Sequence, residues 1–353
     1  MSETDIIYSE QVKAEAARLG FCACGLAPAG PVAAPCADYV RRWLAAGCQG
    51  AMDYLERRVA LRLDPCRLVE GARTVVAVAL PYAPAAALHP DGYALARYAL
   101  GRDYHDVVRG RLRQLMAALG LEEDRDGRPF CDTAPVDERY WAVRCGLGWT
   151  GRNRQLVVPG YGSYVFLGEL VVRRPADVYD TPMASRCGDC RRCLDACPTG
   201  ALTEDGLDAR RCLSYLTIEQ RGPLPPDAGR QMGRCIYGCD RCAEACPWNR
   251  HVPPTPESDF QPSAALRAMT AADWHRLSPE QYRALFRRSA VRRAKYEGLL
   301  RNIRAVEAAA SAAGALLPAE TALPPGGAAY SGGEKIGRRK NRAGGLVIPE
   351  KNS

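Results

Sequence analysis

Eight of the nine cysteines between residues 187 and 246 have spacings that suit metal clusters. The segment CGDCRRCLDACPTG holds four of them as C-x2-C-x2-C-x3-C-P, and CDRCAEACPWN holds three more as C-x2-C-x3-C-P. Soft thiolates are the ligands that iron–sulfur clusters take, and short spacings let one loop wrap several corners of a cubane. Cys212 supplies the eighth thiolate, since Ile236 stands where the second pattern lacks a cysteine. The sequence therefore predicts two [4Fe–4S] clusters.

The fourth cysteine of such a run ligates the other cluster, which divides the eight thiolates into two sets. The first cysteine set is Cys187, Cys190, Cys193 and Cys246. The second cysteine set is Cys197, Cys212, Cys239 and Cys242. Cys235 is the alternative to Cys212, and we prefer Cys212 because Cys235 would have to share a tight turn with Cys239.

Zinc and disulfide bonds are the alternative uses of these cysteines. Two C-x2-C pairs alone could form a zinc ribbon, but a three-step run that ends in C-P is not typical of zinc. The N-terminal residues show neither a secretory signal nor a twin-arginine signal, and no apolar stretch is long enough to span a bilayer. We therefore expect a cytoplasmic protein without membrane contact, whose remaining cysteines are free thiols.

Length and composition predict additional domains around the cysteine module. The chain has 353 residues, which is too long for a ferredoxin alone, and its net charge of +8 permits an anionic partner without requiring one. We predict four segments: an α/β (α+β) domain over residues 1–175, a bacterial-ferredoxin-like two-[4Fe–4S] module over 176–256, a basic helical segment over 257–310, and a tail over 311–353 whose composition is typical of disorder.

Hydrophobic periodicity and capping residues define the elements of the first segment. The apolar, β-branched run at residues 74–82 predicts a buried strand. An acidic start and a glycine stop predict a helix over residues 103–119. Further helices are expected over residues 8–19, 35–47 and 137–144, with a turn at residues 134–135 and two strands before residue 172.

Several polar residues of the first segment are candidates for chemistry. Asp132 follows an apolar stretch and precedes a turn, so it could be a catalytic acid or could form the turn. Asp137 and Glu138 stand where a helix begins, and we expect them to cap it. His105 lies in DYHDVVRG, where Val108 replaces the glycine of the D-x-H-x-x-G signature of histidine-ligated cobalamin, so we expect a packing or surface residue.

Two other patterns carry less information. The glycines of GLGWTG have G-x-G-x-x-G spacing, but a predicted helix precedes them where a dinucleotide site needs a strand. The sequence FRRSAVRRAKYEGLLRNIR predicts a helix with a basic face, which could be solvated or could line a phosphate backbone. The residues alone leave that choice open.

Residues 8–304 resemble the epoxyqueuosine reductases, cobalamin- and iron–sulfur-dependent enzymes of tRNA queuosine synthesis. The resemblance lies in ARYALGRDYHDVVR, in CDTAPVDERYWAVRCGLGWTGRNRQLVVPGYGSYVFLGEL, in the cysteine module with CLSYLTIEQRG, and in FRRSAVRRAKYEGLLRNI. It implies that the first segment is a cobalamin-binding catalytic domain. The implied reaction reduces the epoxide of epoxyqueuosine in tRNA to the alkene of queuosine, with electrons relayed through the clusters to a cobalamin that has no histidine ligand.

The resemblance also implies roles for individual residues. Asp132 is the implied proton donor, and burial beside the corrin is expected to raise its pKa. The implied cobalamin contacts are Arg62, Ala96, Arg139, Leu156, Leu167 and Ser214, with Asn153 and Ser163 in the same loop and strand. The implied tRNA surface is Arg292, Arg293, Arg301 and Asn302.

The family implies partners and leaves two rivals. The electron donor is expected to be a flavodoxin or ferredoxin, and we expect a monomer. A reductive dehalogenase is similar in architecture, but such enzymes usually carry a twin-arginine signal and protonate through a tyrosine and a basic residue. A non-catalytic iron–sulfur electron carrier is the second rival.

Overall fold

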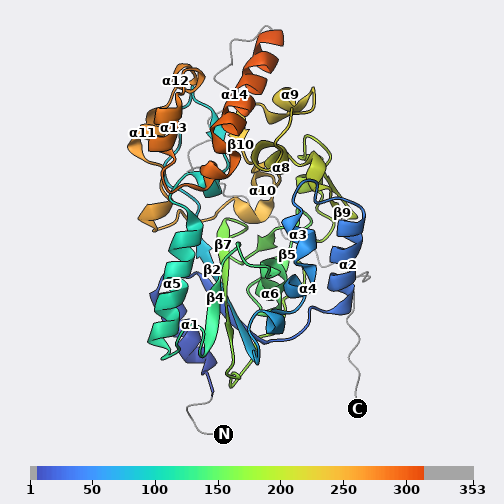
Figure 1. Cartoon of the computed structure of the whole chain (residues 1–353), viewed down its shortest axis with the longest axis vertical. Helices are drawn as coiled ribbons and strands as arrows, with labels where there is room; N and C mark the ends of the chain where they lie inside the picture. Colours follow the sequence, from blue (N-terminus) through green and yellow to red (C-terminus); the bar gives the residue numbers. More distant parts are fainter. Residues whose placement is uncertain (1–5, 314–353) are drawn as a thin grey trace, which may run out of the picture. The chain divides into compact units, whose positions relative to one another are not determined.

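The computed structural model describes residues 6–313, and a four-stranded sheet lies at the centre of its N-terminal half (Figure 1). Its strands, in spatial order, are β1 (Ala23–Pro28), β2 (Thr74–Pro81), β7 (Val165–Val172) and β4 (Gly127–Phe130), and each is antiparallel to its neighbour. Every residue of β2 is buried, which confirms the strand predicted from its apolar run.

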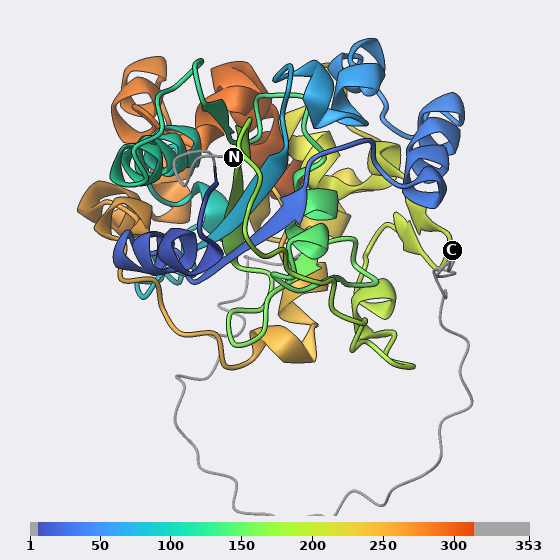
Figure 2. The same cartoon turned by 90° about the horizontal axis from the view of Figure 1, so that it is seen from below.

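Helices cover both faces of this sheet, as Figure 2 shows. Alternate residues of β2 point to opposite faces. Val76, Val78 and Leu80 belong to a core shared with α1 (Ser9–Arg18) and α5 (Tyr104–Ala118). The intervening residues Val75, Ala77 and Ala79 belong to a second core with α6 (Glu138–Arg144). The two cores fix the positions of α5 and α6, and therefore of the polar residues at the N-termini of these helices.

Side-chain caps begin the two helices. Asp103 accepts a hydrogen bond from the His105 N–H at the start of α5, and Asp137 accepts one from the Tyr140 N–H at the start of α6. The predicted helices over 103–119 and 137–144 are confirmed within one residue at each end. The remaining elements of this half are α2 (Ala34–Ala45), α3 (Tyr54–Arg57), α4 (Val59–Arg62), η2 (Pro65–Arg67), β3 (Ala94–Leu95), η3 (Arg97–Ala99), β5 (Trp149–Thr150) and β6 (Leu156–Val157).

The cysteine segment consists of short elements. These are α7 (Arg192–Asp195), β8 (Leu202–Thr203), β9 (Gly206–Leu207), η4 (Ala209–Arg211), α8 (Leu213–Ile218), α9 (Ala228–Met232), β10 (Cys235–Tyr237), α10 (Arg241–Glu244) and η5 (Pro247–Asn249). Strand β10 pairs in parallel with β3, so the cysteine segment is hydrogen-bonded to the first half. Trp43 of α2 also donates its indole N–H to the Leu207 carbonyl. The boundary predicted between residues 175 and 176 stays a prediction.

The C-terminal part is a set of helices rather than one. They are η6 (Ser258–Phe260), α11 (Ala264–Ala268), α12 (Ala271–His275), α13 (Pro279–Leu285), η7 (Ala290–Ala294) and α14 (Lys295–Ala312). The prediction of a single basic helix is wrong, because Arg288 and Lys295 have φ angles of 59° and 60° that turn the chain on either side of η7. The tail predicted from residue 311 begins inside α14 and, from residue 314, lies outside the described residues.

Among residues 6–313, no helix combines the length and the apolar character needed to cross a membrane.

Candidate active site

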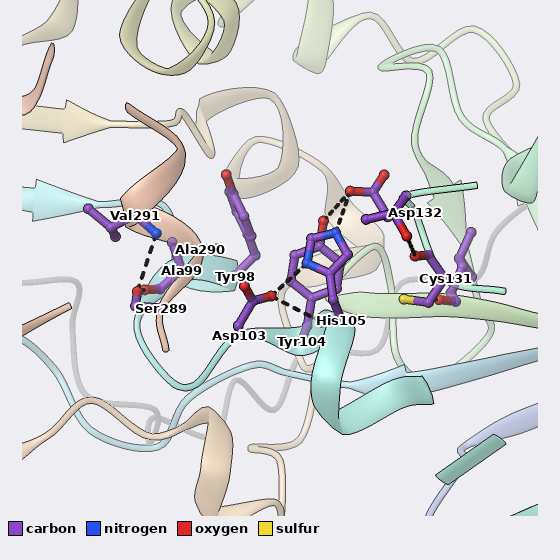
Figure 3. Close-up of polar contacts among 12 residues, drawn as sticks. Tyr98, Ala99, Asp103, Tyr104, His105, Cys131, Asp132, Ser289, Ala290 and Val291 are labelled. Carbon is purple, nitrogen blue, oxygen red and sulfur yellow. Dashed lines mark hydrogen bonds and ion pairs between the residues drawn. The ribbon is translucent and has the colours of Figure 1, made fainter. Parts of the chain in front are cut away.

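Asp132 lies in the loop between β4 and α6, with a φ of 55°. Its carboxylate oxygen Oδ2 accepts a hydrogen bond from the Tyr104 hydroxyl at 2.6 Å and lies 3.0 Å from Nε2 of His105. Figure 3 shows both side chains, from the first turn of α5, pointing toward the carboxylate. The Asp132 side chain is 53% exposed, so it remains accessible to a ligand. The sequence predicted the aspartate but not its two partners.

His105 connects two carboxylates. Its Nδ1 lies 2.6 Å from Oδ1 of Asp103, the residue that caps α5, while its Nε2 faces Asp132. Burial lowers the pKa of His105, but the hydrogen bonds to the two aspartates outweigh it and raise the pKa to about 9. The imidazole is therefore protonated at neutral pH. His105 packs on Tyr104, whose ring it stacks against at 4.1 Å, as the prediction of a packing residue allows, but the sequence did not predict its two carboxylate partners.

The contacts around Asp132 lower its pKa in the protein without a corrin, so the raised pKa expected beside a bound corrin stays a prediction. Burial raises it, as expected, but the hydrogen bonds from His105 and Tyr104 together lower it below the ordinary value of an aspartate. In this arrangement Asp132 is a carboxylate, and the proton between Asp132 and His105 resides on the imidazole. Asp132 therefore needs a proton from a neighbour before it can act as an acid.

Glu138 and Asp137 have different roles, although both begin α6. Asp137 caps the helix as predicted. Glu138 instead accepts a hydrogen bond from the backbone N–H of Asp132. Burial, and next the charge of Asp132, raise the pKa of Glu138 to about 7. Glu138 lies in the first turn of α6, where the sequence placed it, but its carboxylate accepts from the Asp132 N–H and not from an N–H of the helix.

A cavity of about 260 Å³ opens beside the Asp132 carboxylate. It is lined by five of the predicted cofactor residues, namely Ala96, Arg139, Leu156, Leu167 and Ser214. Among its other lining residues are Tyr98, Tyr104, Gln155, Ser163, Cys239 and Cys242. The sheet, α5, α6 and the cysteine segment therefore meet at one concave site.

Two predicted cofactor residues are not among the lining of this cavity. Arg62 donates from a terminal nitrogen to the Val136 carbonyl at 3.0 Å, which supports the loop that carries Asp132. Asn153 is 3% exposed and lines a second cavity of about 320 Å³.

The second cavity is lined by the complete first cysteine set. Cys187, Cys190, Cys193 and Cys246 surround it, with Arg152, Asn153, Arg186 and Trp248 among the other lining residues. Burial raises the pKa of the Cys246 thiol, and the nearby Cys187 and Cys190 raise it further. In the described chain no three His, Cys, Asp or Glu side chains converge on a site for one metal ion, whereas a cubane offers each cysteine its own iron atom.

The second cysteine set lies next to the Asp132 cavity, since Cys239 and Cys242 belong to its lining. Burial raises the pKa of Cys239, and Cys212 is close enough to contribute to the shift. Cys235 differs, because its Sγ faces the carbonyl oxygens of Tyr237 and Gly238 at 3.5 and 3.3 Å. These contacts favour Cys212 as the eighth ligand.

The predicted tRNA residues divide into two kinds. Arg292 and Arg293 are exposed, although Arg293 pairs with Glu219 at 2.8 Å. Arg301 donates to the carbonyl oxygens of Leu216, Gln220 and Gly222 at the end of α8. Asn302 is 0% exposed and donates to the carbonyls of Thr217 and Ile236. The structure does not place the Asn302 side chain on an RNA-binding surface.

Two family models match the chain. The model described as "Epoxyqueuosine reductase QueG, DUF1730" matches residues 62–133, and the "4Fe-4S double cluster binding domain" matches residues 186–249. The first match includes Tyr104, His105 and Asp132, and the second includes both cysteine sets. Residues 186–249 therefore form a double [4Fe–4S] cluster binding domain.

Similar proteins cover most of the chain. An epoxyqueuosine reductase of Cellulophaga algicola is 38% identical over 298 residues, which cover 84% of this chain and 97% of that protein. One of Leadbetterella byssophila is 40% identical over 297 residues, with the same coverage. A crystal structure of an epoxyqueuosine reductase with an epoxyqueuosine-modified tRNA-Tyr stem loop has a TM-score of 0.78 and 28% identity, covering 85% of this chain and 80% of that one. The chain belongs to the epoxyqueuosine reductase family.

Proposed function

We propose that this protein reduces the epoxide of epoxyqueuosine in the anticodon loop of tRNA, with Asp132 as the proton donor. The observation that carries the assignment is the shared cavity: Asp132 and two members of the second cysteine set, Cys239 and Cys242, line the same concave site. A proton source and an electron source therefore face one substrate position. The two rivals are not favoured, because the relatives that cover most of the chain are epoxyqueuosine reductases.

The residues of the Asp132 cavity fit a corrin. Ala96, Leu156 and Leu167 offer apolar contact to a ring, and Ser214 and Arg139 offer polar groups to its amide side chains. The buried hydroxyl of Ser163 has no hydrogen-bond partner among residues 6–313, so it is available to such a group. When bound there, cobalamin supplies the reducing cobalt centre. Arg62 would act through the Asp132 loop, and Asn153 through the first cysteine set.

Two [4Fe–4S] clusters would be held by the two cysteine sets and would supply single electrons. The first set is the one we assign to the electron entry point, because its cavity is also lined by Trp248, whose side chain is 37% exposed. A small redox protein such as a flavodoxin or ferredoxin is the proposed donor. The second set, at the Asp132 cavity, is the proposed exit.

The reaction consumes two electrons and two protons, breaks both carbon–oxygen bonds of the epoxide and releases water. Asp132 would protonate the departing oxygen. His105 would return a proton to Asp132 across the 3.0 Å contact, because the imidazole is protonated at neutral pH. Asp103 orients the ring through Nδ1. In one structure of the Bacillus subtilis enzyme the catalytic loop of an aspartate is swung out of the active site, and we propose the same mobility for the loop of Asp132.

The tRNA would approach over Arg292 and Arg293, which are exposed on η7. A tRNA stem loop is bound to one of the solved relatives, which supports an RNA substrate here. Arg301 and Asn302 would stabilise this surface indirectly, because their hydrogen bonds fix α14 to α8. A tRNA substrate and the free thiols suit the cytoplasm, and we propose a monomer.

A reconstituted assay tests the proposal directly. The protein, loaded with iron and sulfide, is given tRNA that carries epoxyqueuosine and a chemical reductant, with and without added cobalamin. We expect queuosine to form only with cobalamin, and purified protein to retain cobalt together with about eight irons. A protein with full clusters that neither binds cobalamin nor forms queuosine would be the electron carrier of the rival hypothesis.

A further inference from the structure

The Asp132 loop has a second carboxylate contact, on the backbone side. The carboxylate oxygen Oδ2 of Asp132 is held by Tyr104 and His105, while its N–H donates to Oε1 of Glu138. A φ of 55° is unfavourable for a residue with a Cβ, although aspartate tolerates it better than most. The inward position of Asp132 therefore depends on contacts that offset this cost, and Glu138 provides the contact that fixes the backbone.

A third carboxyl group lies behind Glu138. Glu169 of β7 is 0% exposed, and neither of its carboxyl oxygens has a hydrogen-bond partner among the described residues. It pairs in the sheet with Ala77 on one side and Phe130 on the other, two residues before Asp132. A lone glutamate in the apolar strand VFLGELVV is a costly residue to bury, which points to a role at this position.

The two glutamates influence each other. Burial raises the pKa of Glu169 well above its ordinary value, and the charge of Glu138 raises it further. Glu169 therefore stays protonated when Glu138 ionises, because two carboxylates in this buried position repel each other. Other charged or titratable groups also face the pair. They are Arg62 of α4, Cys131, Asp132 and Asp137 of the β4–α6 loop, Arg139 of α6, and Cys145 directly after α6.

We propose that Glu138 is the latch of the Asp132 loop: its carboxylate holds the Asp132 N–H and keeps the acid over the cavity, while neutral Glu169 allows that carboxylate to form. Glu138 is thus a positioning residue, and Asp132 performs the proton transfer. The effect of Glu138 on turnover rests on the proposed function. The hydrogen bond from the Asp132 N–H to Glu138 does not, because it is present in the resting protein. An ionised acceptor makes the stronger hydrogen bond, so the latch is strongest above about pH 7, near the pKa of Glu138.

Hydrogen exchange of the holoenzyme tests the latch without turnover. In Glu138→Ala we expect the amides of residues 132–136, apart from Pro135, which has none, to exchange at least tenfold faster, because a hydrogen bond to a charged group is lost. Asp137→Ala is the matched control: it removes the adjacent cap of α6 and should accelerate the Tyr140 amide while sparing Asp132. Equal exchange of residues 132–136 in Glu138→Ala and the parent protein would overturn the proposal.

Kinetics give the second readout. For Glu138→Ala we expect kcat to fall at least tenfold with a KM for tRNA within about twofold of the parent, and for Glu138→Gln a smaller loss, since the amide oxygen keeps an acceptor. The rise of kcat near pH 7 should be absent in Glu138→Gln. Faster loop exchange with unchanged kcat in Glu138→Ala would overturn the positioning role. Turnover by Asp132→Asn would instead refute the proposed function and leave the exchange result to decide the latch.

Discussion

The cysteine segment and the Asp132 site reach their geometry in different ways. Seven of the eight predicted cluster ligands lie in two short runs whose spacing along the chain already fits a cubane. The Asp132 site instead joins α5, the β4–α6 loop and β7, and its protonation depends on hydrogen bonds between side chains far apart in sequence. Local spacing reveals a ligand set, whereas a proton-transfer site depends on tertiary packing.

Substitution of Asp132 should have the largest effect, and it should affect the proton-transfer site without affecting the cysteine segment. For Asp132→Asn we expect a loss of kcat of about 10²- to 10⁴-fold, the usual contribution of a general acid. Cluster and cobalamin content should be unchanged, because Asp132 supports neither set of cysteines. Single-turnover reduction of modified tRNA, with iron and cobalt analysis of the same sample, measures both. Undiminished turnover would remove Asp132 from the mechanism.

Cys212, the eighth proposed ligand, lies outside the two cysteine runs, so spacing alone does not distinguish it from Cys235. In Cys212→Ser we expect loss of one cluster, or about half of the iron, and in Cys235→Ser full iron content, because the Cys235 thiol faces carbonyl oxygens. Iron analysis and electron paramagnetic resonance of both variants provide the comparison. The reverse pattern would exchange the two assignments.

Charge reversal on η7 tests the proposed RNA surface. In the double variant Arg292→Glu, Arg293→Glu we expect tRNA to bind about tenfold or more weakly. The slope of log Kd against log salt concentration should also become shallower, by the amount that corresponds to the loss of up to about two phosphate contacts. Arg276→Glu, an exposed arginine of the same helical region, is the control. Equal binding by the double variant and the parent would mean that the basic face is only solvated.

The smallest effect concerns stability. The folded pKa of Glu169 lies well above the ordinary 4.5, so the folded state keeps a proton that the unfolded state loses above about that pH, and stability falls as pH rises. Glu169→Gln has no proton to lose, so the Tm of this variant relative to the Tm of the parent protein should rise between pH 5.5 and 8. Thermal unfolding at both pH values tests this. A difference in Tm that is the same at both would show that Glu169 does not titrate on unfolding.

Sequence reasoning succeeded where a pattern is local. The buried strand at 74–82 and the helices that begin after Asp103 and Asp137 follow from periodicity and capping, and all three are present. The single basic helix failed, because two non-glycine residues adopt positive φ angles that no propensity predicts. The contact between His105 and Asp132 was missed for a different reason: the two residues are 27 positions apart, so only the fold reveals the pair.

Signals for the missed residues exist in hindsight. Tyr104 and His105 directly follow a capping aspartate, and the Cα–Cβ bonds of helical residues tilt toward the N-terminus, which here lies beside the Asp132 loop. Glu169 interrupts an otherwise apolar strand. Neither signal gives the direction of a pKa shift, since that depends on whether the neighbouring group donates a hydrogen bond or carries a like charge.

Arg301 ties the last described helix to the iron-binding part of the chain. Its guanidinium donates to carbonyl oxygens at the C-terminal end of α8, the helix that begins directly after Cys212. Asn302 donates to the carbonyl oxygens of Thr217 in α8 and Ile236 in β10. Shortening the protein before α14 would leave that helix end without its donors and would expose Met232 and Ile236, which belong to the same buried core as Leu299 and Ile303 of α14. A fragment that ends at residue 294 would keep every proposed iron ligand and should nevertheless lose metal faster than the intact chain. Retention of the cofactor is thus a property of the whole scaffold.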